Sequence, residues 1–148
     1  MSATTEQRPV VPRPLPVPNE WDRGYWDAAR EGRLVVQYCA KCDKVHGLPR
    51  LMCPTCRGMD MGWRNASGKG KIHSWSTLYR AFHPAFADLP RTVAVIELDD
   101  YPQVHLTTTL HLPDGMQESD LAIGQAVEVT FTPASAEITL PEFRLTGR

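Results

Sequence analysis

Four cysteines are the residues of this sequence whose spacing most clearly predicts chemistry. They form two C-x-x-C pairs with ten residues between them: Cys39, Cys42, Cys53 and Cys56. Each pair predicts a knuckle that turns two sulfurs toward one point, and the short spacer lets a hairpin bring the knuckles together. Four converging thiolates make a closed tetrahedral zinc site without an open coordination position, so we expect a structural metal. Iron is the alternative, because four sulfurs suit both metals.

Three other interpretations of these residues are less favoured. Two disulfides conflict with a reducing cytoplasm, which is where we expect this chain. The N-terminus shows no apolar signal segment, and no apolar run is long enough to span a membrane. A redox C-x-x-C motif uses one pair in a strand–helix unit rather than two facing pairs. His46 follows the first knuckle, but four sulfurs already saturate the metal.

The residues around the cysteines predict the hairpin that must carry them. Residues 33–38 predict a strand that enters the first knuckle, and residues 44–49 predict the return toward the second. We therefore expect a zinc ribbon over residues 34–62.

A helix is predicted before the ribbon, over residues 19–33. Asn19 is a favourable N-cap and Gly32 supplies a stop. Large aromatic side chains gather in this helix, and we expect them either to pack on the ribbon or to contact another chain; they are Trp21, Tyr25 and Trp26.

From Met61 onward the pattern is all-β, and it predicts a barrel over residues 63–148. Five strands with turns between them favour a small closed barrel of the oligonucleotide/oligosaccharide-binding (OB) type. The segment 92–98 is almost continuously apolar, which predicts a buried strand. After a short segment at 61–66, the predicted strands are 71–80, 92–98, 104–112, 126–132 and 138–144. The predicted fold class is thus mainly β, with an N-terminal helix, a four-cysteine zinc ribbon and a five-stranded OB-fold barrel.

The composition is that of a globular protein with an uneven charge. The 148 residues are 42% hydrophobic and 22% charged, with a net charge of −1, which argues against a protein that coats nucleic acid. Residues 1–73 carry a net charge of +5 and residues 74–148 a net charge of −6, so the two parts favour different partners. An acidic barrel disfavours single-stranded nucleic acid as a ligand. Residues 1–18 form a proline-rich arm, which we expect to be extended.

A few basic side chains are the remaining candidates for ligand binding. The G-K-G-K motif at 68–71 departs from the P-loop pattern. It predicts either a plain glycine turn or point charges for phosphates such as those of coenzyme A. A later loop carries an arginine and a histidine beside two phenylalanines. The weak acyl-CoA site predicted from these two segments comprises Lys69, Lys71, Arg80 and His83.

No catalytic residue is predicted from the sequence. His105 and His111 lie on one polar strand face, but six residues of strand separate them by about 20 Å, so we expect two unrelated surface histidines. Nothing assembles a nucleophile, a base and an oxyanion hole. We therefore expect that the chain does not catalyse a reaction alone.

In their order, these motifs resemble the DUF35 family of acyl-CoA-associated zinc-ribbon/OB-fold proteins. The resemblance covers residues 19–145 and leaves out the proline arm. The chain departs from the family in that arm and at Arg57, where the family often has glycine. The matching stretches are 25–34, 39–42, 48–50, 53–56, 67–76, 123–129 and 140–144.

The resemblance implies an accessory subunit. Such proteins partner thiolase-like enzymes, including thiolases, lipid-transfer-type aldolases and acyltransferases, in hetero-oligomers with, for example, two copies of each chain. The partner supplies the catalytic residues, and the small chain helps it to assemble and to hold acyl-CoA, with steroid side-chain or aromatic acyl-CoA degradation as the context. The alternatives are a free-standing acyl-CoA-binding module or a partner of a MaoC-type acyl-CoA hydratase.

Overall fold

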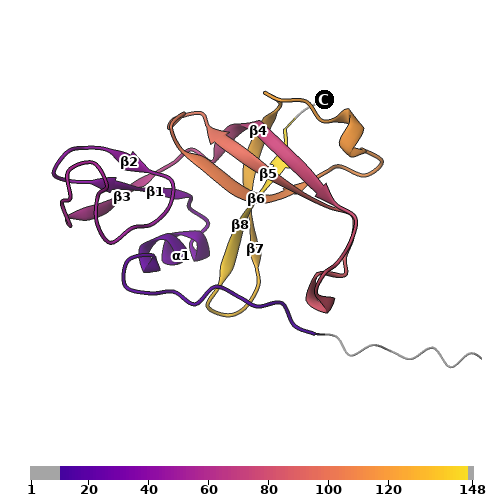
Figure 1. Cartoon of the computed structure of the whole chain (residues 1–148), viewed down its shortest axis with the longest axis horizontal. Coiled ribbons are helices and arrows are strands. Elements are labelled where there is room, and N and C mark those ends of the chain that lie inside the picture. The colour runs from indigo at the N-terminus through magenta and orange to yellow at the C-terminus, as the bar shows by residue number, and fades with distance from the viewer. Residues whose placement is uncertain (1–10, 147–148) are drawn as a thin grey trace, which may run out of the picture.

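The computed structural model describes residues 11–146 and contains one α-helix, a small ribbon sheet and a closed barrel (Figure 1). The predicted fold class is confirmed, and the first ten residues of the predicted arm lie outside the described part. The elements are α1 (Arg23–Arg30), β1 (Val35–Cys39), β2 (Val45–His46), β3 (Met61–Asn65), β4 (Lys69–Leu78), η1 (Pro84–Phe86), β5 (Arg91–Leu98), β6 (His105–His111), η2 (Glu118–Asp120), β7 (Ala126–Pro133) and β8 (Thr139–Leu145).

The ends of α1 follow from local hydrogen bonds. Asn19 Oδ1 accepts from the backbone N–H groups of Trp21 and Asp22, and the Asp22 carboxylate accepts from the Asn19 N–H at 2.7 Å. This reciprocal pair closes a turn over residues 19–22, and α1 begins only after that turn. The N-cap of α1 is Asp22, which makes no side-chain cap hydrogen bond, and not the predicted Asn19. The helix is therefore shorter than the predicted range 19–33. At the other end Gly32 has a φ of 73°. Its N–H and that of Arg33 bond back to carbonyls in the last helical turn, which closes the helix.

The ribbon sheet has the strand order β2-β1-β3. All five residues of β3 pair with β1, from Asn65 opposite Val35 to Met61 opposite Cys39. β3 therefore crosses the position between residues 62 and 63 where the sequence predicts the boundary of ribbon and barrel, and that boundary stays a prediction. Alternation along a strand indicates which side chains share a face, but not which sheet the strand joins.

The barrel closes in the order β4-β5-β6-β8-β7, with β4 also pairing with β7. The five strands match the five predicted ones. The apolar strand β5 differs from the expectation in one respect, because its residues alternate between fully and partly buried. In a barrel only one face of a strand points into the core. Ala94, Ile96 and Leu98 point inward, whereas Val93 and Val95 are only half-buried.

Ribbon and barrel share one hydrophobic core. Leu34 and Val36, at the start of the ribbon, belong to the same buried cluster as Ile72, Ile96 and Phe143 of the barrel. The helix α1 lies between the two parts and contacts β1, β7 and β8 (Figure 1). The core that holds the barrel closed thus also anchors the base of the ribbon.

The described part of the proline-rich arm, residues 11–18, forms no helix or strand. Arg13 fixes it to the loop between β4 and β5. Its Nε donates to the carbonyl of Ala85 at 3.1 Å, its guanidinium pairs with Asp88, and it lies 5.6 Å from the ring centre of Phe86. Among the described residues no helix is long and apolar enough to cross a membrane.

Candidate metal centre

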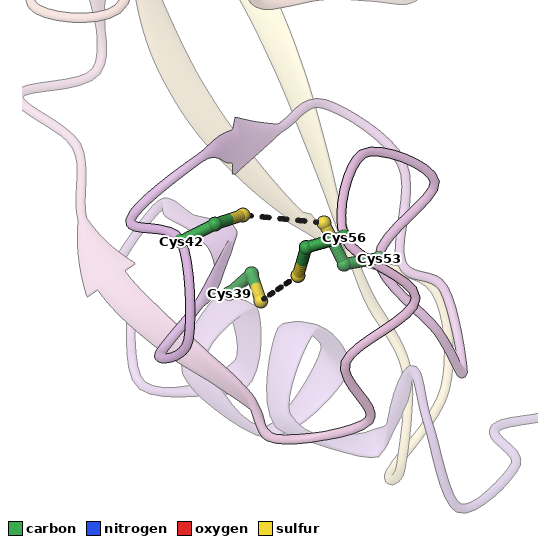
Figure 2. A group of neighbouring side chains, drawn as sticks. All are labelled: Cys39, Cys42, Cys53 and Cys56. Atoms are coloured by element: carbon green, nitrogen blue, oxygen red, sulfur yellow. Dashed lines mark hydrogen bonds between the residues drawn. The ribbon is translucent and has the colours of Figure 1, made fainter.

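The four cysteine sulfurs converge at the tip of the ribbon (Figure 2). All lie within 4.8 Å of one another, and the Cys39–Cys56 and Cys42–Cys53 separations are both 3.6 Å. None of the four is in a disulfide. Four sulfurs at about 2.3 Å from a tetrahedral zinc ion stand about 3.8 Å apart. The observed separations therefore fit a four-sulfur metal site.

Two matching backbone turns bring the sulfurs together. In each knuckle the residue after the second cysteine has a positive φ, 60° at Asp43 and 57° at Arg57. Its N–H bonds to the carbonyl of the first cysteine of the pair, at 2.8 Å for Cys39 and 2.9 Å for Cys53. Each C-x-x-C spacing thus folds locally into the same closed turn. Arg57 takes up this left-handed conformation although it is not a glycine.

The electrostatics of the cluster favour a bound cation. Burial raises the pKa of Cys53, but the N–H groups of Cys56 and Thr55 and the His46 side chain outweigh this and lower it to about 5. At Cys42 the Lys44 N–H lowers the pKa, but burial and the neighbouring thiols raise it to about 12. Four adjacent thiols cannot all ionise without a compensating charge, and a divalent metal ion supplies that charge.

His46 lies beside the cluster and is not one of the four converging groups. Its Nε2 is 3.5 Å from Cys53 Sγ. It stands on β2 opposite Gln37 of β1, so strand pairing aims its ring at the sulfur. A histidine in this position orients and stabilises a thiolate ligand from outside the coordination sphere.

The four basic residues predicted to contact acyl-CoA lie in two separate places. Lys69 and Lys71 are at the start of β4, whereas Arg80 and His83 follow its end. The seven residue steps from Lys71 to the end of β4 span about 23 Å. His83 Nδ1 also accepts a hydrogen bond from the Ala85 N–H at the start of η1.

The glycines of the G-K-G-K motif have a steric role. A Cβ at Gly70 would lie 2.5 Å from the backbone oxygen of Glu97, and Gly68 has a φ of 77°. These two glycines permit close contact between strands at the seam of the barrel.

Two histidine contacts were not predicted from the sequence. His111 Nε2 lies 2.8 Å from Glu142 Oε2 on the neighbouring strand β8. His105 stacks on His73, with 4.4 Å between ring centres. The two expected surface histidines are thus far apart, as predicted, but each has a partner on another strand. Sequence spacing carries no signal for these pairs, because each joins residues about thirty positions apart.

Comparison with known proteins matches the two parts of the structure to two family models. Residues 26–62 match a model described as the rubredoxin-like zinc ribbon domain of ChsH2, and residues 63–132 match the C-terminal OB-fold domain of ChsH2. A DUF35 domain-containing scaffold protein of Methanothermobacter thermautotrophicus is 32% identical over 67% of this chain and 71% of its own length. The chain belongs to the DUF35 family. A second DUF35 scaffold protein, from Methanocaldococcus jannaschii, is 31% identical over 66% of this chain and 67% of its own length.

Other relatives of this DUF35 protein extend the comparison. A Thermomonospora curvata protein named "Probable enoyl-CoA hydratase alpha subunit" is 36% identical over 95% of this chain, which spans only 42% of that relative. The solved structure of the Ltp2-ChsH2(DUF35) aldolase contains a chain with 33% identity and a TM-score of 0.77, over 88% of this chain and 98% of that one. A DUF35 protein of unknown function from Sulfolobus solfataricus shares the fold, with 11% identity and a TM-score of 0.58 over 86% of each chain.

Proposed function

We propose that this DUF35 protein is a non-catalytic accessory subunit of a thiolase-like enzyme that acts on carbon–carbon bonds of acyl-CoA substrates. The similarity to a chain of the Ltp2-ChsH2(DUF35) aldolase carries this proposal, because it extends over 98% of that chain. The two archaeal relatives named as scaffold proteins support a role in assembly. Cys39, Cys42, Cys53 and Cys56 hold a structural zinc ion in this proposal, and that ion fixes the shape of the ribbon.

The partner surface in this proposal is the apolar outer side of the ribbon. Leu48 and Met59 are 65% and 64% exposed, and Leu51 and Met52 are about half exposed. Leu51 and Met59 line one shallow pocket together with Trp21, and exposed apolar side chains of this size are typical of protein interfaces. The four leucine and methionine side chains lie in the loops that lead into and out of the second knuckle, so the metal ion controls the conformation of the surface that meets the partner.

In this proposal the chain contacts acyl-CoA only as part of the complex with its partner enzyme. Arg80 supplies a positive charge in a loop whose Tyr79 and Phe82 are 67% and 91% exposed. The lysines at the other end of β4 are too far from Arg80 to hold the same phosphate group. A charge-reversed R80E variant should weaken the binding of acyl-CoA by the complex. A K69E/K71E variant tests whether the two lysines at the start of β4 contribute to that binding.

Co-expression tests the proposal. The untagged chain is produced together with a tagged thiolase-like enzyme from the same genome. We expect a stable hetero-oligomer, with cleavage of a 3-hydroxyacyl-CoA into a carbonyl compound and a shorter acyl-CoA only when both chains are present. A L51D/M59D variant should lose the partner. An I123D variant is the matched control, because Ile123 is 73% exposed but lies on the barrel. A partner that is fully active alone, with no complex, would overturn the proposal.

A hydratase partner is the second candidate. The Thermomonospora curvata relative, named an enoyl-CoA hydratase subunit, carries more than half of its length outside the region shared with this chain. In this alternative a separate MaoC-type chain supplies the hydratase activity. Addition of water to an enoyl-CoA by the co-purified complex, without carbon–carbon cleavage, would favour it. Coenzyme A binding by the isolated chain would instead indicate a free-standing acyl-CoA-binding module.

A further inference from the structure

Three side chains able to bind a metal meet on the outer face of the barrel, well separated in sequence from the cysteines. His73 on β4, Glu97 on β5 and His105 on β6 come from three adjacent strands. Their donor atoms all lie within 4.8 Å of one another. Within residues 11–146, the only other group of three or more potential ligands this close together is the four-cysteine cluster.

The strand pairing builds this group. Glu97 and His105 are direct partners across β5 and β6. On β4 the register jumps, because Ile72 pairs with Ile96 while Ser74 pairs with Val95. His73 is therefore the extra residue of a β-bulge. A bulge changes the direction of a side chain and is frequent beside functional sites.

Ordinary hydrogen bonds do not explain why these side chains lie so close together. Glu97 Oε2 is 3.8 Å from His105 Nε2 and 4.0 Å from His73 Nδ1, which is beyond hydrogen-bond distance. The two imidazole rings stack with 4.4 Å between centres and 28° between planes. Two imidazoles thus face one carboxylate, and no hydrogen bond links the three groups.

Two imidazoles and one carboxylate are a ligand set for Zn²⁺ and related transition metals. We propose that His73, Glu97 and His105 form a second metal site that binds a divalent transition-metal ion on the barrel surface. Ligand atoms about 2.0–2.1 Å from a tetrahedral ion stand about 3.3 Å apart. The side chains are 38% to 51% exposed, so side-chain rotation can close the remaining gap.

The second site differs in kind from the cysteine site. Three protein ligands leave a coordination position open to water or to a ligand, whereas four sulfurs leave none. Lys71 pairs with Glu97 across β4 and β5, and its positive charge opposes a cation there. We therefore expect weaker binding than at the cysteines. His105 also lines a cavity of about 310 Å³ with Tyr25, Trp26 and Leu48, so the site borders the junction of ribbon and barrel.

Metal titration tests this proposal on the full chain, purified without a polyhistidine tag and already carrying one zinc ion per chain. Zn²⁺ is added in an isothermal titration. We expect the wild-type chain to bind a second equivalent. His73→Ala and His105→Ala should weaken that second binding step at least 100-fold, because losing a direct ligand costs more than losing an outer contact. His111→Ala is the matched control, since His111 is a half-exposed histidine on β6, the strand of His105. This variant should bind the second equivalent as tightly as the wild type.

Two results would overturn the proposal: a wild-type chain that binds no second equivalent, or histidine variants that bind it as tightly as the wild type. Circular dichroism checks the fold of each variant. Glu97→Gln removes a ligand oxygen with little change of shape. If a histidine variant does not fold, Glu97→Gln replaces it in the test and should also weaken the second binding step. The experiment needs no partner enzyme, so its failure is distinct from a failure of the proposed accessory role.

Discussion

At the level of single residues, the fold of the ribbon places the four cysteine sulfurs at distances that suit a shared metal ion. The positive φ values of Asp43 and Arg57 give the two knuckles the same closed turn. Backbone N–H groups and His46 then favour the thiolate form of Cys53. The metal site therefore depends on groups outside the four cysteines, and these groups can be tested one at a time.

His46→Ala tests the contact to Cys53. We expect the variant to retain one zinc ion per chain but to bind it 10- to 100-fold more weakly, because outer contacts of metal ligands typically contribute this much. Competition with a chromogenic chelator measures the affinity. His83→Ala, in the loop between β4 and β5, is the control and should match the wild type. Equal affinities for the wild type and His46→Ala would show that the contact is incidental.

Glu142 is a second residue whose surroundings predict a measurable effect. It is only 8% exposed. Burial raises its pKa, but hydrogen bonds from Thr132 at 2.7 Å and His111 at 2.8 Å outweigh this and hold the pKa below its usual value of 4.5. A lowered pKa in the folded state means that the carboxylate stabilises the fold above pH 4.5. This contribution is lost as the pH falls through the folded-state pKa.

Glu142→Gln should therefore lower the free energy of unfolding by about 1–2 kcal/mol at pH 7. The difference from the wild type should shrink as the pH falls below 4.5. Urea denaturation from pH 7 to pH 3 measures it. Both proteins lose zinc in acid, so the difference between them isolates Glu142. A difference that stays constant with pH would contradict the assignment.

At the level of elements, β4 joins the parts of the barrel. It pairs with β5 along its length and with β7 at its start, and its bulge brings His73 toward Glu97. The start of this strand is crowded, because Gly70 lies against the backbone of β5. Gly32 has a different constraint: there is free space for a Cβ, but its φ is 73°.

These two glycines predict different costs. Gly70→Ala should destabilise the chain by about 3 kcal/mol, since a methyl group there meets a backbone oxygen that cannot move freely. Gly32→Ala should cost about 1 kcal/mol, which is the penalty for a left-handed alanine. Urea denaturation of both variants at pH 7 provides the comparison. An equal or smaller cost at Gly70 would mean that the strands separate easily at this point.

At the level of the whole molecule, ribbon and barrel are joined by their common core. Leu34 and Val36 are buried with barrel residues, and Tyr25 of α1 is buried enough that its pKa is raised to about 12. Loss of the metal should therefore weaken the barrel as well as the ribbon.

Zinc removal tests this coupling. We expect chelation to lower the single melting transition of the chain by about 10 °C or more, because a tightly bound ion adds several kcal/mol to the folded state. Hydrogen exchange of β5 amides should accelerate. Cys39→Ser should reproduce both effects, and chelator should then cause no further change. Two separate transitions, with the barrel transition unchanged, would show that the two parts unfold independently.

The features that sequence reasoning predicted are those encoded over short distances along the chain. The C-x-x-C spacing folds each knuckle locally. Gly32 ends the helical segment through a bond to Ala29, and alternating side chains identify the barrel strands. Each of these signals depends on neighbours in the chain, so none requires knowledge of the rest of the fold.

Tertiary structure alone decided which distant residues meet. The pairing of β3 with the ribbon and the meeting of His73, Glu97 and His105 both depend on strand register. Register is fixed by side-chain packing against the common core and by a bulge of one residue. Apart from the Glu97–His105 pair, these contacts join residues more than 20 positions apart, and local spacing carries no record of them.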